Sequence, residues 1–340
     1  MTRALSPIYA SAILCAGALS GAPASAQSPG DFYKGKTVNV LIGVGVGGEY
    51  DLHARIVARH IGKHAPGAPN FVPQNMTGAG GAKMAAYLAE VAPKDGTNIG
   101  MIANNFPAMQ AAGLDVIRFD LGKFQWIGSI SPTVETMTVT KAAGVNSIEE
   151  ATRKEVIVGA TGKGAITYSF PAMLNEFLGT KFKIVPGYPG GNQINLAMER
   201  GEVQARNNTW SSWKVTKPDW IKNGDIKILA YAGPAPKDLP GVPNVVDLVK
   251  SADDKRTVEL IVSGTMLGRP LAFAGDVPAD RVAAIRAAFV QTMKDPEFLG
   301  EADKLKIEVD PVSGEDMQKV VANVLATPKN LAARARTIIE

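Results

Sequence analysis

Short apolar runs alternate with longer amphipathic segments in the first part of the chain. Segments whose apolar residues recur every three or four positions predict helices, and the short apolar runs between them predict strands. The predicted strands are 37–42, 70–74 and 98–103. The predicted helices are 50–64 and 83–91. Strands that alternate with helices indicate a parallel α/β sheet.

The same plan returns after a strand predicted at 135–140, which we expect to cross into a second α/β unit. In that unit the predicted strands are 156–160, 183–186, 204–208 and 226–231, and the predicted helices are 169–178 and 193–200. The Pro- and Gly-rich run 233–244 predicts a long surface connection. Beyond it we predict strands at 258–263 and 271–274, a helix at 281–294 capped by Asp280, and helices at 314–325 and 328–338.

Glycine clusters follow several predicted strands, at the edge of an open parallel sheet where ligands bind. The clusters are Gly43–Gly48, Gly78–Gly81, Gly162–Gly164 and Gly190–Gly191. Glycine lets the backbone approach a ligand closely, and the free N–H groups at the start of a helix attract an anion. Any one cluster is also explained as a tight turn. Two or more clusters at facing edges of two similar units favour a shared ligand cleft.

The first cluster also raises the question of a nucleotide site, because Gly43, Gly45 and Gly48 match the G-x-G-x-x-G spacing. A dinucleotide site needs an acidic residue about 20 positions further on. No Asp or Glu lies between Asp51 and Glu90. Carboxylates in the first turn of the next helix, Glu49 and Asp51, would repel a pyrophosphate. We therefore expect no nucleotide and no other cofactor.

The N-terminal segment has the form of a secretory signal. It has one basic residue, Arg3, an apolar stretch over 8–19 and the A-x-A sequence Ala24-Ser25-Ala26. The apolar stretch is too short to span a bilayer. We predict a signal peptide over residues 1–26, cleaved near Ala26, and a mature protein in the periplasm.

Composition narrows the classes of function further. With 340 residues, of which 46% are apolar, the chain has room for two domains of ordinary size. Cys15 is the only cysteine and lies in the predicted signal, so we expect no disulfide, thiolate metal site or cysteine nucleophile in the mature protein. Lys and Arg total 36 against 32 Asp and Glu and are scattered. A nucleic-acid-binding protein usually gathers positive charge on one face, so we expect no nucleic acid partner.

Five sequence blocks occur in an order and spacing that resemble one family. They are VGGEYDLHAR at 46–55, NMTGAGG at 75–81, APKDGT at 92–97, GKGAITY at 162–168 and GYPGG at 187–191. They are similar to the family patterns P-G-G-x-x-D-x-x-A-R, N-x-x-G-A-G-G, A-P-x-D-G-T, G-x-G-T-x-x-H and P-Y-x-G-G. On these blocks, nearly the whole mature chain resembles the TctC or Bug family, the periplasmic receptors of tripartite tricarboxylate transporters.

The resemblance implies an α/β fold of the type II periplasmic binding protein kind, in which crossing strands join two domains around a cleft. We place the first domain at 27–131 plus 248–340 and the second at 132–247. The family captures small mono-, di- or tricarboxylates and hands them to membrane permease subunits. The resemblance therefore implies a monomeric receptor rather than an enzyme, with a small carboxylate ligand and a permease as its partners.

By position, the resemblance also implies which loops contact the ligand. The implied residues are Val44, Gly45, Val46, Gly47, Gly48, Thr161, Gly162, Gly164, Ala165, Thr167, Tyr188, Gly190 and Gly191. The chain departs from the family pattern in three places: Val46 replaces the usual proline, Ala165 and Ile166 stand where the family has hydroxyls, and Asn207-Asn208, beside Arg206, replaces an acidic or small polar position.

Polar side chains at two predicted strand ends are further candidates. Arg206 lies near the expected cleft, where a guanidinium binds a carboxylate through two hydrogen bonds; a solvent-facing arginine on an edge strand is the alternative. Asn208 and Thr209 are candidates for hydrogen bonds to a ligand. Asn104 and Asn105 follow strand 98–103 and either reach the cleft from the first domain or only form a turn.

Aromatic and histidine side chains are ambiguous. Tyr168, Trp210 and Trp213 either form an aromatic wall or pack in the interior. His60 and His64 are four positions apart, as in a metal pair, but no Glu lies between them and no cysteine completes a set. We expect these helix histidines to face solvent and to bind no metal. A Ser-His-Asp hydrolase is poorly supported, because no G-x-S-x-G turn is present and the histidines cluster on one helix.

We therefore predict a periplasmic receptor that closes two domains around a small carboxylate. Two alternatives stay open. One is a receptor for an uncharged or zwitterionic solute, which would use Asn side chains and Glu49 rather than Arg206. The other is an exported α/β enzyme, either a hydrolase or a nucleotide-dependent enzyme.

Overall fold

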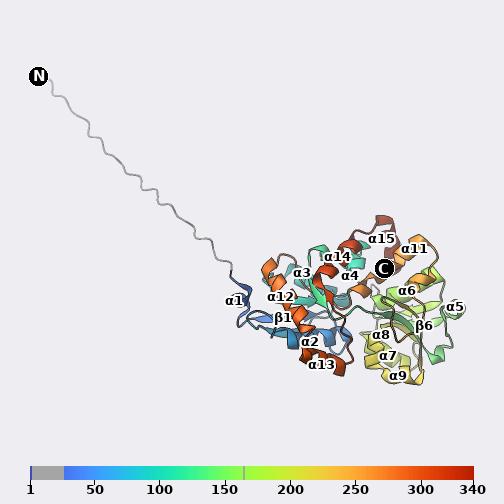
Figure 1. The fold of residues 1–340 in the computed structure, drawn as a ribbon. Coiled ribbons are helices and arrows are strands. Elements are labelled where there is room, and N and C mark those ends of the chain that lie inside the picture. The colour runs from blue at the N-terminus through green and yellow to red at the C-terminus, as the bar shows by residue number, and fades with distance from the viewer. Residues whose placement is uncertain (2–26, 164) are drawn as a thin grey trace.

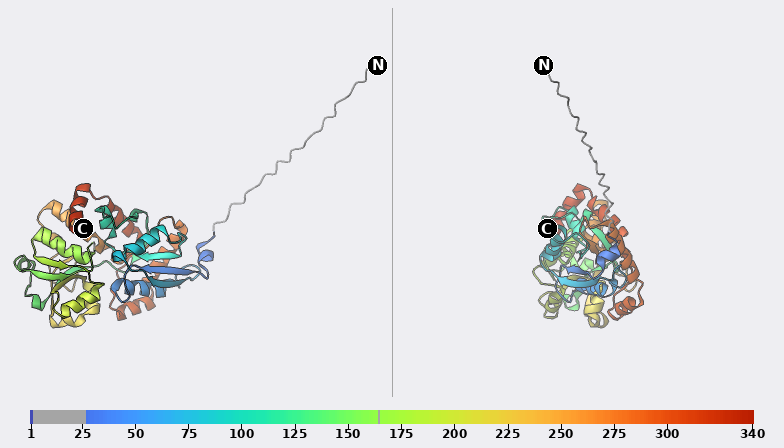
Figure 2. Two further views of the ribbon diagram at one scale, coloured as in Figure 1. Left: turned by 180° about the vertical axis from the view of Figure 1, so that it is seen from behind. Right: turned by 90° about the vertical axis from the view of Figure 1, so that its left-hand side faces the viewer.

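The computed structural model describes Met1 and residues 27–163 and 165–340 (Figure 1). The predicted signal peptide, apart from Met1, and the candidate ligand residue Gly164 lie outside the described residues. Two sheets lie side by side, and each is covered by helices (Figure 2). We call each sheet with its helices a lobe, the first lobe being the one that contains the N-terminal strand.

The first lobe is built on a six-stranded sheet. Its strand order is β11 (Val312–Ser313), β4 (Gln125–Ser129), β10 (Leu271–Phe273), β3 (Asn98–Met101), β1 (Thr37–Ile42) and β2 (Asn70–Asn75). Strands β1, β2 and β3 are parallel, whereas β10 is antiparallel to both β3 and β4. The C-terminal part of the chain therefore completes a sheet that the N-terminal part begins.

The second lobe is built on a five-stranded sheet. Its order is β7 (Phe182–Val185), β6 (Val156–Gly159), β8 (Ala205–Thr209), β5 (Glu135–Thr140) and β9 (Ile226–Ala232). Strands β6, β7 and β8 are parallel, and β5 is antiparallel to its neighbours β8 and β9. This is the predicted plan of two α/β units.

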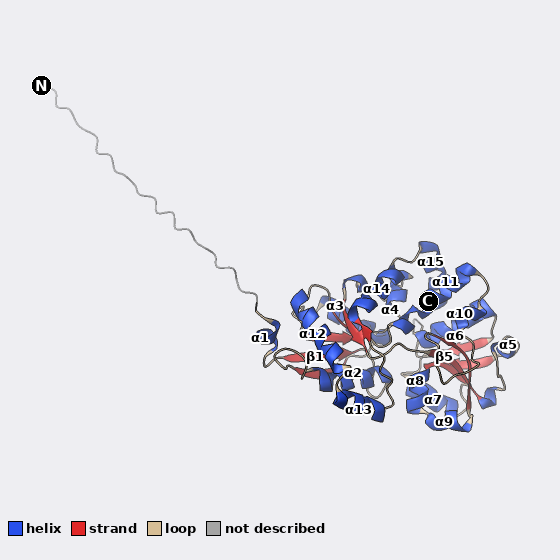
Figure 3. Cartoon of the chain, in the orientation of Figure 1, coloured by secondary structure: helices blue, strands red, loops and turns tan. Residues whose placement is uncertain are grey.

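Helices cover both faces of each sheet (Figure 3). In the first lobe, one apolar core joins β1 to α1 (Pro29–Tyr33), α2 (Glu49–Ile61), α12 (Ala279–Thr292) and α13 (Pro296–Lys304). A second core lies on the other face of this sheet, under α3 (Ala82–Glu90), α4 (Phe106–Ala111) and α14 (Gly314–Leu325). The same core continues into the second lobe. There its helices are α5 (Ile148–Ala151), α6 (Ile166–Leu178), α10 (Val245–Leu248), α11 (Ala252–Val262) and α15 (Lys329–Ile339).

A third apolar core lies on the remaining face of the second sheet. It is formed by α7 (Gly191–Glu199), α8 (Trp210–Thr216) and α9 (Pro218–Asn223) with β9. Trp213 is fully buried there, and Trp210 is 7% exposed. The two tryptophans therefore pack in this core, which decides between the two sequence interpretations in favour of packing.

Two segments cross between the lobes. Residues 130–134 join β4 to β5, and residues 263–270 return from α11 to β10. The two segments run beside each other, since Thr133 N–H donates to the Thr265 carbonyl at 2.8 Å. The predicted domain boundaries near residues 131 and 248 remain a prediction.

Two predictions about elements are wrong. The predicted strand 258–263 is helical, because Ser251 caps α11 through the Asp254 N–H and the buried Val258, Ile261 and Val262 follow the helical rather than the strand period. Asp280 is not the cap of α12: the helix begins at Ala279, and Pro278 occupies the cap position with no side-chain hydrogen bond.

Candidate functional site

The edges at which the parallel strands of the two sheets end face each other. Strands β1, β2 and β3 end on one edge of the first lobe, and β6, β7 and β8 end on one edge of the second. Glu49, in the first turn of α2 directly after β1 and its glycine loop, accepts a hydrogen bond from the Thr209 hydroxyl at the end of β8 (2.7 Å). Loops that are remote in sequence therefore meet between the lobes, as the topology predicts.

The loop 44–48 is shaped by one buried carboxylate. Asp51, 2% exposed, accepts from the Gly47 N–H (3.0 Å), from Arg55 Nε (2.9 Å) and from Asn75 Nδ2 (2.9 Å). Asn75 Nδ2 also donates to the Val44 carbonyl (2.9 Å). Burial acts to raise the pKa of Asp51, but these hydrogen bonds outweigh it and hold the pKa below its ordinary value.

The glycines of this loop have different roles. A Cβ at Gly43 would lie 2.6 Å from the Gly81 Cα, so Gly43 lets the first glycine loop pack against the Gly78–Gly81 loop. Gly45 and Gly47 face open space, and Val46 is 75% exposed. The predicted contact residues Gly45, Val46 and Gly47 therefore lie at an accessible surface, whereas Gly43 is a packing residue.

Three helices begin at these loops without a side-chain cap. The cap positions are Gly48 for α2, Ala165 for α6 and Gly190 for α7, and none makes a side-chain hydrogen bond to its helix. Thr209, Ser251, Asp295 and Ser313 cap α8, α11, α13 and α14 through their side chains, whereas α3, α4, α12 and α15, like α2, α6 and α7, have no side-chain cap. The first N–H groups of an uncapped helix need a partner from outside the helix, and an anion suits them.

The hydroxyls of the second-lobe loop bond to one another. Thr167 Oγ1 accepts from the Thr161 N–H (3.0 Å) and lies 2.9 Å from Thr161 Oγ1. Gly162 faces open space beside them. Tyr188 N–H donates to the Ala160 carbonyl (3.2 Å), and its ring packs against the third core. The candidates Thr161, Gly162, Thr167 and Tyr188 are thus gathered at one edge of the second sheet.

Arg206 is buried behind this edge. Its Nη1 donates to the Gly191 carbonyl (2.6 Å) and to Asn195 Oδ1 (2.7 Å), and its Nε donates to the Asn207 carbonyl (3.0 Å). Burial lowers the pKa of Arg206 to about 10, with Glu135 acting in the opposite sense. A buried guanidinium with these partners positions the start of α7, and its direct contact with a ligand carboxylate remains a prediction.

Asn208 carries an amide without a partner. Its Oδ1 accepts from Arg206 Nη2 (3.1 Å), whereas its Nδ2 is buried and has no hydrogen-bond partner. The residue is 7% exposed. A buried donor without a hydrogen-bond partner lowers the stability of the folded protein. An acceptor from outside the described residues would therefore stabilise this amide.

Asn104 and Asn105 lie at the same edge of the first lobe, after β3. Asn104 is 7% exposed, and its N–H donates to the Tyr50 hydroxyl (3.1 Å). Asn105 occupies the cap position of α4, and its Nδ2 donates to Met109 Sδ (3.4 Å). Both therefore have turn and packing contacts, and their contact with a ligand remains a prediction.

Sequence reasoning missed the charged group that joins the lobes. Besides the Thr209 bond, Glu49 accepts from the Ser211 hydroxyl (2.6 Å) and from Arg269 Nη2. Burial acts to raise the pKa of Glu49, but Arg269 and the hydroxyl hydrogen bonds hold it below its ordinary value. Arg269, 220 positions from Glu49, precedes the short strand β10, and no local pattern marks it as a partner.

Two other buried titratable groups flank this pair. His53 Nε2 lies 3.9 Å from Glu49 Oε1, and its Nδ1 is buried without a partner. Burial and the Arg269 charge lower the pKa of His53 to about 3, so the imidazole is neutral at pH 7. Burial raises the pKa of Glu135 above its ordinary value, against the hydrogen bond from Asn207 Nδ2 (3.0 Å).

The expectation that the helix histidines face solvent is wrong for His53 and for His60, whose side chain is 12% exposed, and holds only in part for His64, at 26%. His53 is 3% exposed; His60 packs edge-on against Phe298 and lies 2.7 Å from Glu301 Oε2; and His64 lies 2.6 Å from Asp295 Oδ2. Helix α13, which the sequence did not predict, covers this face of α2. Possible metal ligands do gather here, in His60, Asp295 and Glu297, but Lys63 Nζ already pairs with both carboxylates.

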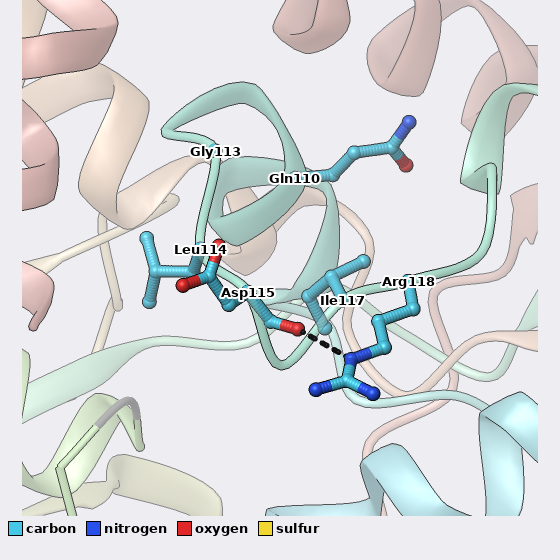
Figure 4. Close-up of a pocket in the computed structure, with 6 residues that line it drawn as sticks. All are labelled: Gln110, Gly113, Leu114, Asp115, Ile117 and Arg118. Atoms are coloured by element: carbon cyan, nitrogen blue, oxygen red, sulfur yellow. Dashed lines mark hydrogen bonds between the residues drawn. The ribbon is translucent and has the colours of Figure 1, made fainter.

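Two surface hollows lie away from these loops. One, of about 410 Å³, is lined by Gln110, Gly113, Leu114, Asp115, Ile117 and Arg118, at the end of α4 (Figure 4). Within it Arg118 Nε donates to the Asp115 carbonyl (3.2 Å). The other, of about 180 Å³, lies against β9 in the second lobe.

The chain is similar in sequence to a known protein and in fold to several solved structures. No protein-family model matches the chain. The UPF0065 protein in the TAR-I ttuE-ttuC' intergenic region of Agrobacterium vitis is 27% identical over 231 residues, covering 63% of this chain and 62% of that protein. The match thus spans less than two thirds of that relative's length.

Solved structures are similar in fold. BugD, a periplasmic binding protein, has a TM-score of 0.70 at 20% identity, over 91% of this chain and 99% of that chain. A TctC solute-binding protein from Polaromonas has a TM-score of 0.62 at 21% identity, over 89% and 99%. MatC from Rhodopseudomonas palustris, solved with bound malate, has a TM-score of 0.65 at 17% identity, over 90% and 99%. The predicted periplasmic-binding-protein fold, and the resemblance to TctC and Bug proteins, are confirmed at the level of fold.

Proposed function

We propose that this protein is a periplasmic solute-binding receptor that captures a small carboxylate between its two lobes and delivers it to a membrane permease. The observation that carries the proposal is the pair of uncapped N-termini of α6 and α7, which start from loops at the sheet edge that faces the first lobe. Free N–H groups and the positive ends of these two helix dipoles stabilise a carboxylate.

The second lobe adds a local preference for an anion. Arg206 places a buried positive charge behind the start of α7, and the unpaired Asn208 amide offers a donor next to it. The net charge of the whole chain is only +4. Selection of the ligand therefore depends on this local arrangement rather than on long-range attraction.

The similar folds point the same way. BugD and the Polaromonas protein are a periplasmic binding protein and a solute-binding protein, and MatC was solved with malate, a carboxylate. We extend to this chain the receptor role, the periplasmic location after removal of residues 1–26, and action as a monomer alongside permease subunits. None of the helices in the described residues is long and apolar enough to cross a membrane.

The two alternatives are less well supported. Glu49 is already bonded to Thr209, Ser211 and Arg269, so it is not free to receive the ammonium of a zwitterionic ligand. Ser211 donates to a carboxylate rather than to an imidazole, and this arrangement does not activate a serine nucleophile.

Thermal unfolding in the presence of single solutes tests the proposal. We expect one or more small carboxylic acids to raise the melting temperature in proportion to the logarithm of their concentration, with no product detectable by mass spectrometry. Stabilisation by amides or amino acids alone would favour the uncharged or zwitterionic ligand. Conversion of a solute into product would establish an enzyme instead.

A further inference from the structure

We propose that Glu49 acts as a built-in carboxylate that restricts the cleft to ligands with a single carboxylate group. This inference rests on the proposed receptor function and specifies its ligand class. Glu49 lies on α2 in the first lobe. The donors that it bonds are Thr209 and Ser211 in the second lobe and Arg269 in the returning segment 263–270.

Glu49 fills a donor set that would otherwise suit a ligand carboxylate. Its Oε2 accepts from Thr209 Oγ1 (2.7 Å) and from Arg269 Nη2, and its Oε1 accepts from Ser211 Oγ (2.6 Å). The side chain of Glu49 is 12% exposed and that of Arg269 is 3% exposed. One guanidinium and two hydroxyls are thus already committed to a carboxylate of the protein.

The donors that remain available suit one carboxylate group. They are the Asn208 Nδ2 group, buried and unpaired, and the N–H groups at the starts of α6 and α7. The buried Arg206 cation supports this set through its bond to the Gly191 carbonyl. Arg269 Nε is also buried without a partner, but the charge of Arg269 is balanced by Glu49.

A second carboxylate on the ligand would therefore meet a like charge. To reach Arg269, Thr209 and Ser211 it would have to displace Glu49 or lie against it in a space screened from water. Like charges placed together in such a space repel strongly. A monoacid avoids this repulsion, whereas a diacid of the same length does not.

The test is calorimetric titration with acids matched in length, butyrate against succinate and hexanoate against adipate. We expect the wild-type protein to bind at least one monoacid about tenfold or more tightly than its matched diacid. Glu49→Ala frees the Arg269 guanidinium and the two hydroxyls. In this variant the affinity for the matched diacid should rise about tenfold or more, while the affinity for the monoacid changes less than about threefold.

Two further variants keep the test decisive. Glu49→Ala leaves Arg269 buried without its partner, and this variant could fail to fold. Glu49→Gln keeps the size of the side chain and removes its charge. In Glu49→Gln the ratio of the monoacid affinity to the diacid affinity should be smaller than in the wild type. Glu90→Ala, on the exposed end of α3, is the matched control and should leave the ratio unchanged.

Three results would overturn the inference. One is a wild-type protein that binds the diacid as tightly as the matched monoacid. Another is a Glu49→Gln variant in which the ratio of monoacid affinity to diacid affinity equals that of the wild type. If instead no carboxylic acid binds the wild type or any variant, the proposed function fails first and the inference on selectivity falls with it.

Discussion

At the scale of single residues, a few buried polar groups organise the region where the two lobes meet. Asp51 is an example that sequence reasoning located in part. The sequence places it in the first turn of α2, and in the structure its carboxylate accepts from the Gly47 N–H, just before that helix begins. The contact with Asn75, 24 positions away, could not be predicted, because nothing local to either residue specifies it.

His53 gives the clearest prediction at this scale, because its pKa in the folded protein, about 3, lies below its ordinary value of 6.5. The unfolded chain takes up the proton first, so His53 contributes stability that is present above pH 6.5 and is lost as the pH falls toward 3. Between pH 7 and pH 5 this loss amounts to roughly 2 kcal/mol. We expect His53→Gln to remove this part of the pH dependence.

Urea unfolding of wild type and His53→Gln at pH 7 and pH 5 measures the difference. Glu135, whose raised pKa acts in the opposite direction over part of this range, contributes equally to both proteins and cancels in the comparison. An equal loss of stability in the two proteins would show that His53 is not kept neutral by burial.

At the scale of elements, the sequence predicted most strands and helices because the periods of apolar residues are clear. Helix α14 has the predicted bounds 314–325, and β1 has the predicted bounds 37–42. The exceptions have physical reasons. The C-terminal half of α11 is a short apolar run whose helical character depends on its cap at Ser251, seven residues before Val258. The packing of His60 depends on Phe298 and Glu301 of α13, which comes from a distant part of the chain.

The glycine loops yield a prediction that separates packing from ligand approach. Gly43→Ala would place its Cβ 2.6 Å from the Gly81 Cα, so we expect it to lower the free energy of unfolding by about 1–3 kcal/mol. Gly162→Ala meets no atom within 4 Å and should leave stability within about 0.5 kcal/mol of the wild type. Because its Cβ enters open space beside Thr161, it should nevertheless weaken acid binding.

Denaturant unfolding and acid titration of both variants check this pair. Retained acid affinity in Gly162→Ala would mean that no ligand approaches this loop. An unchanged free energy of unfolding in Gly43→Ala would mean that the loops at Gly43 and Gly81 can move apart without a loss of stability.

At the scale of the whole molecule, two lobes share one continuous core while their facing edges carry the polar groups. The order of elements and the glycine blocks were enough to predict this α/β fold, which the similar solved structures confirm. The candidate site was predictable only as a set of loops. The Glu49–Arg269 pair and the unpaired Asn208 amide arise from the packing of distant segments, so a single sequence contains no local signal for them.

The central claim is that a carboxylate binds between the two lobes at the starts of α6 and α7. A crystal structure of the protein with a monocarboxylate that stabilises it against thermal unfolding tests this claim most directly. We predict carboxylate oxygens within about 3 Å of backbone N–H groups at the start of α6 or α7 and of Asn208 Nδ2. A carboxylate bound instead in the hollow lined by Gln110 and Arg118, with the facing loops empty, would contradict the account.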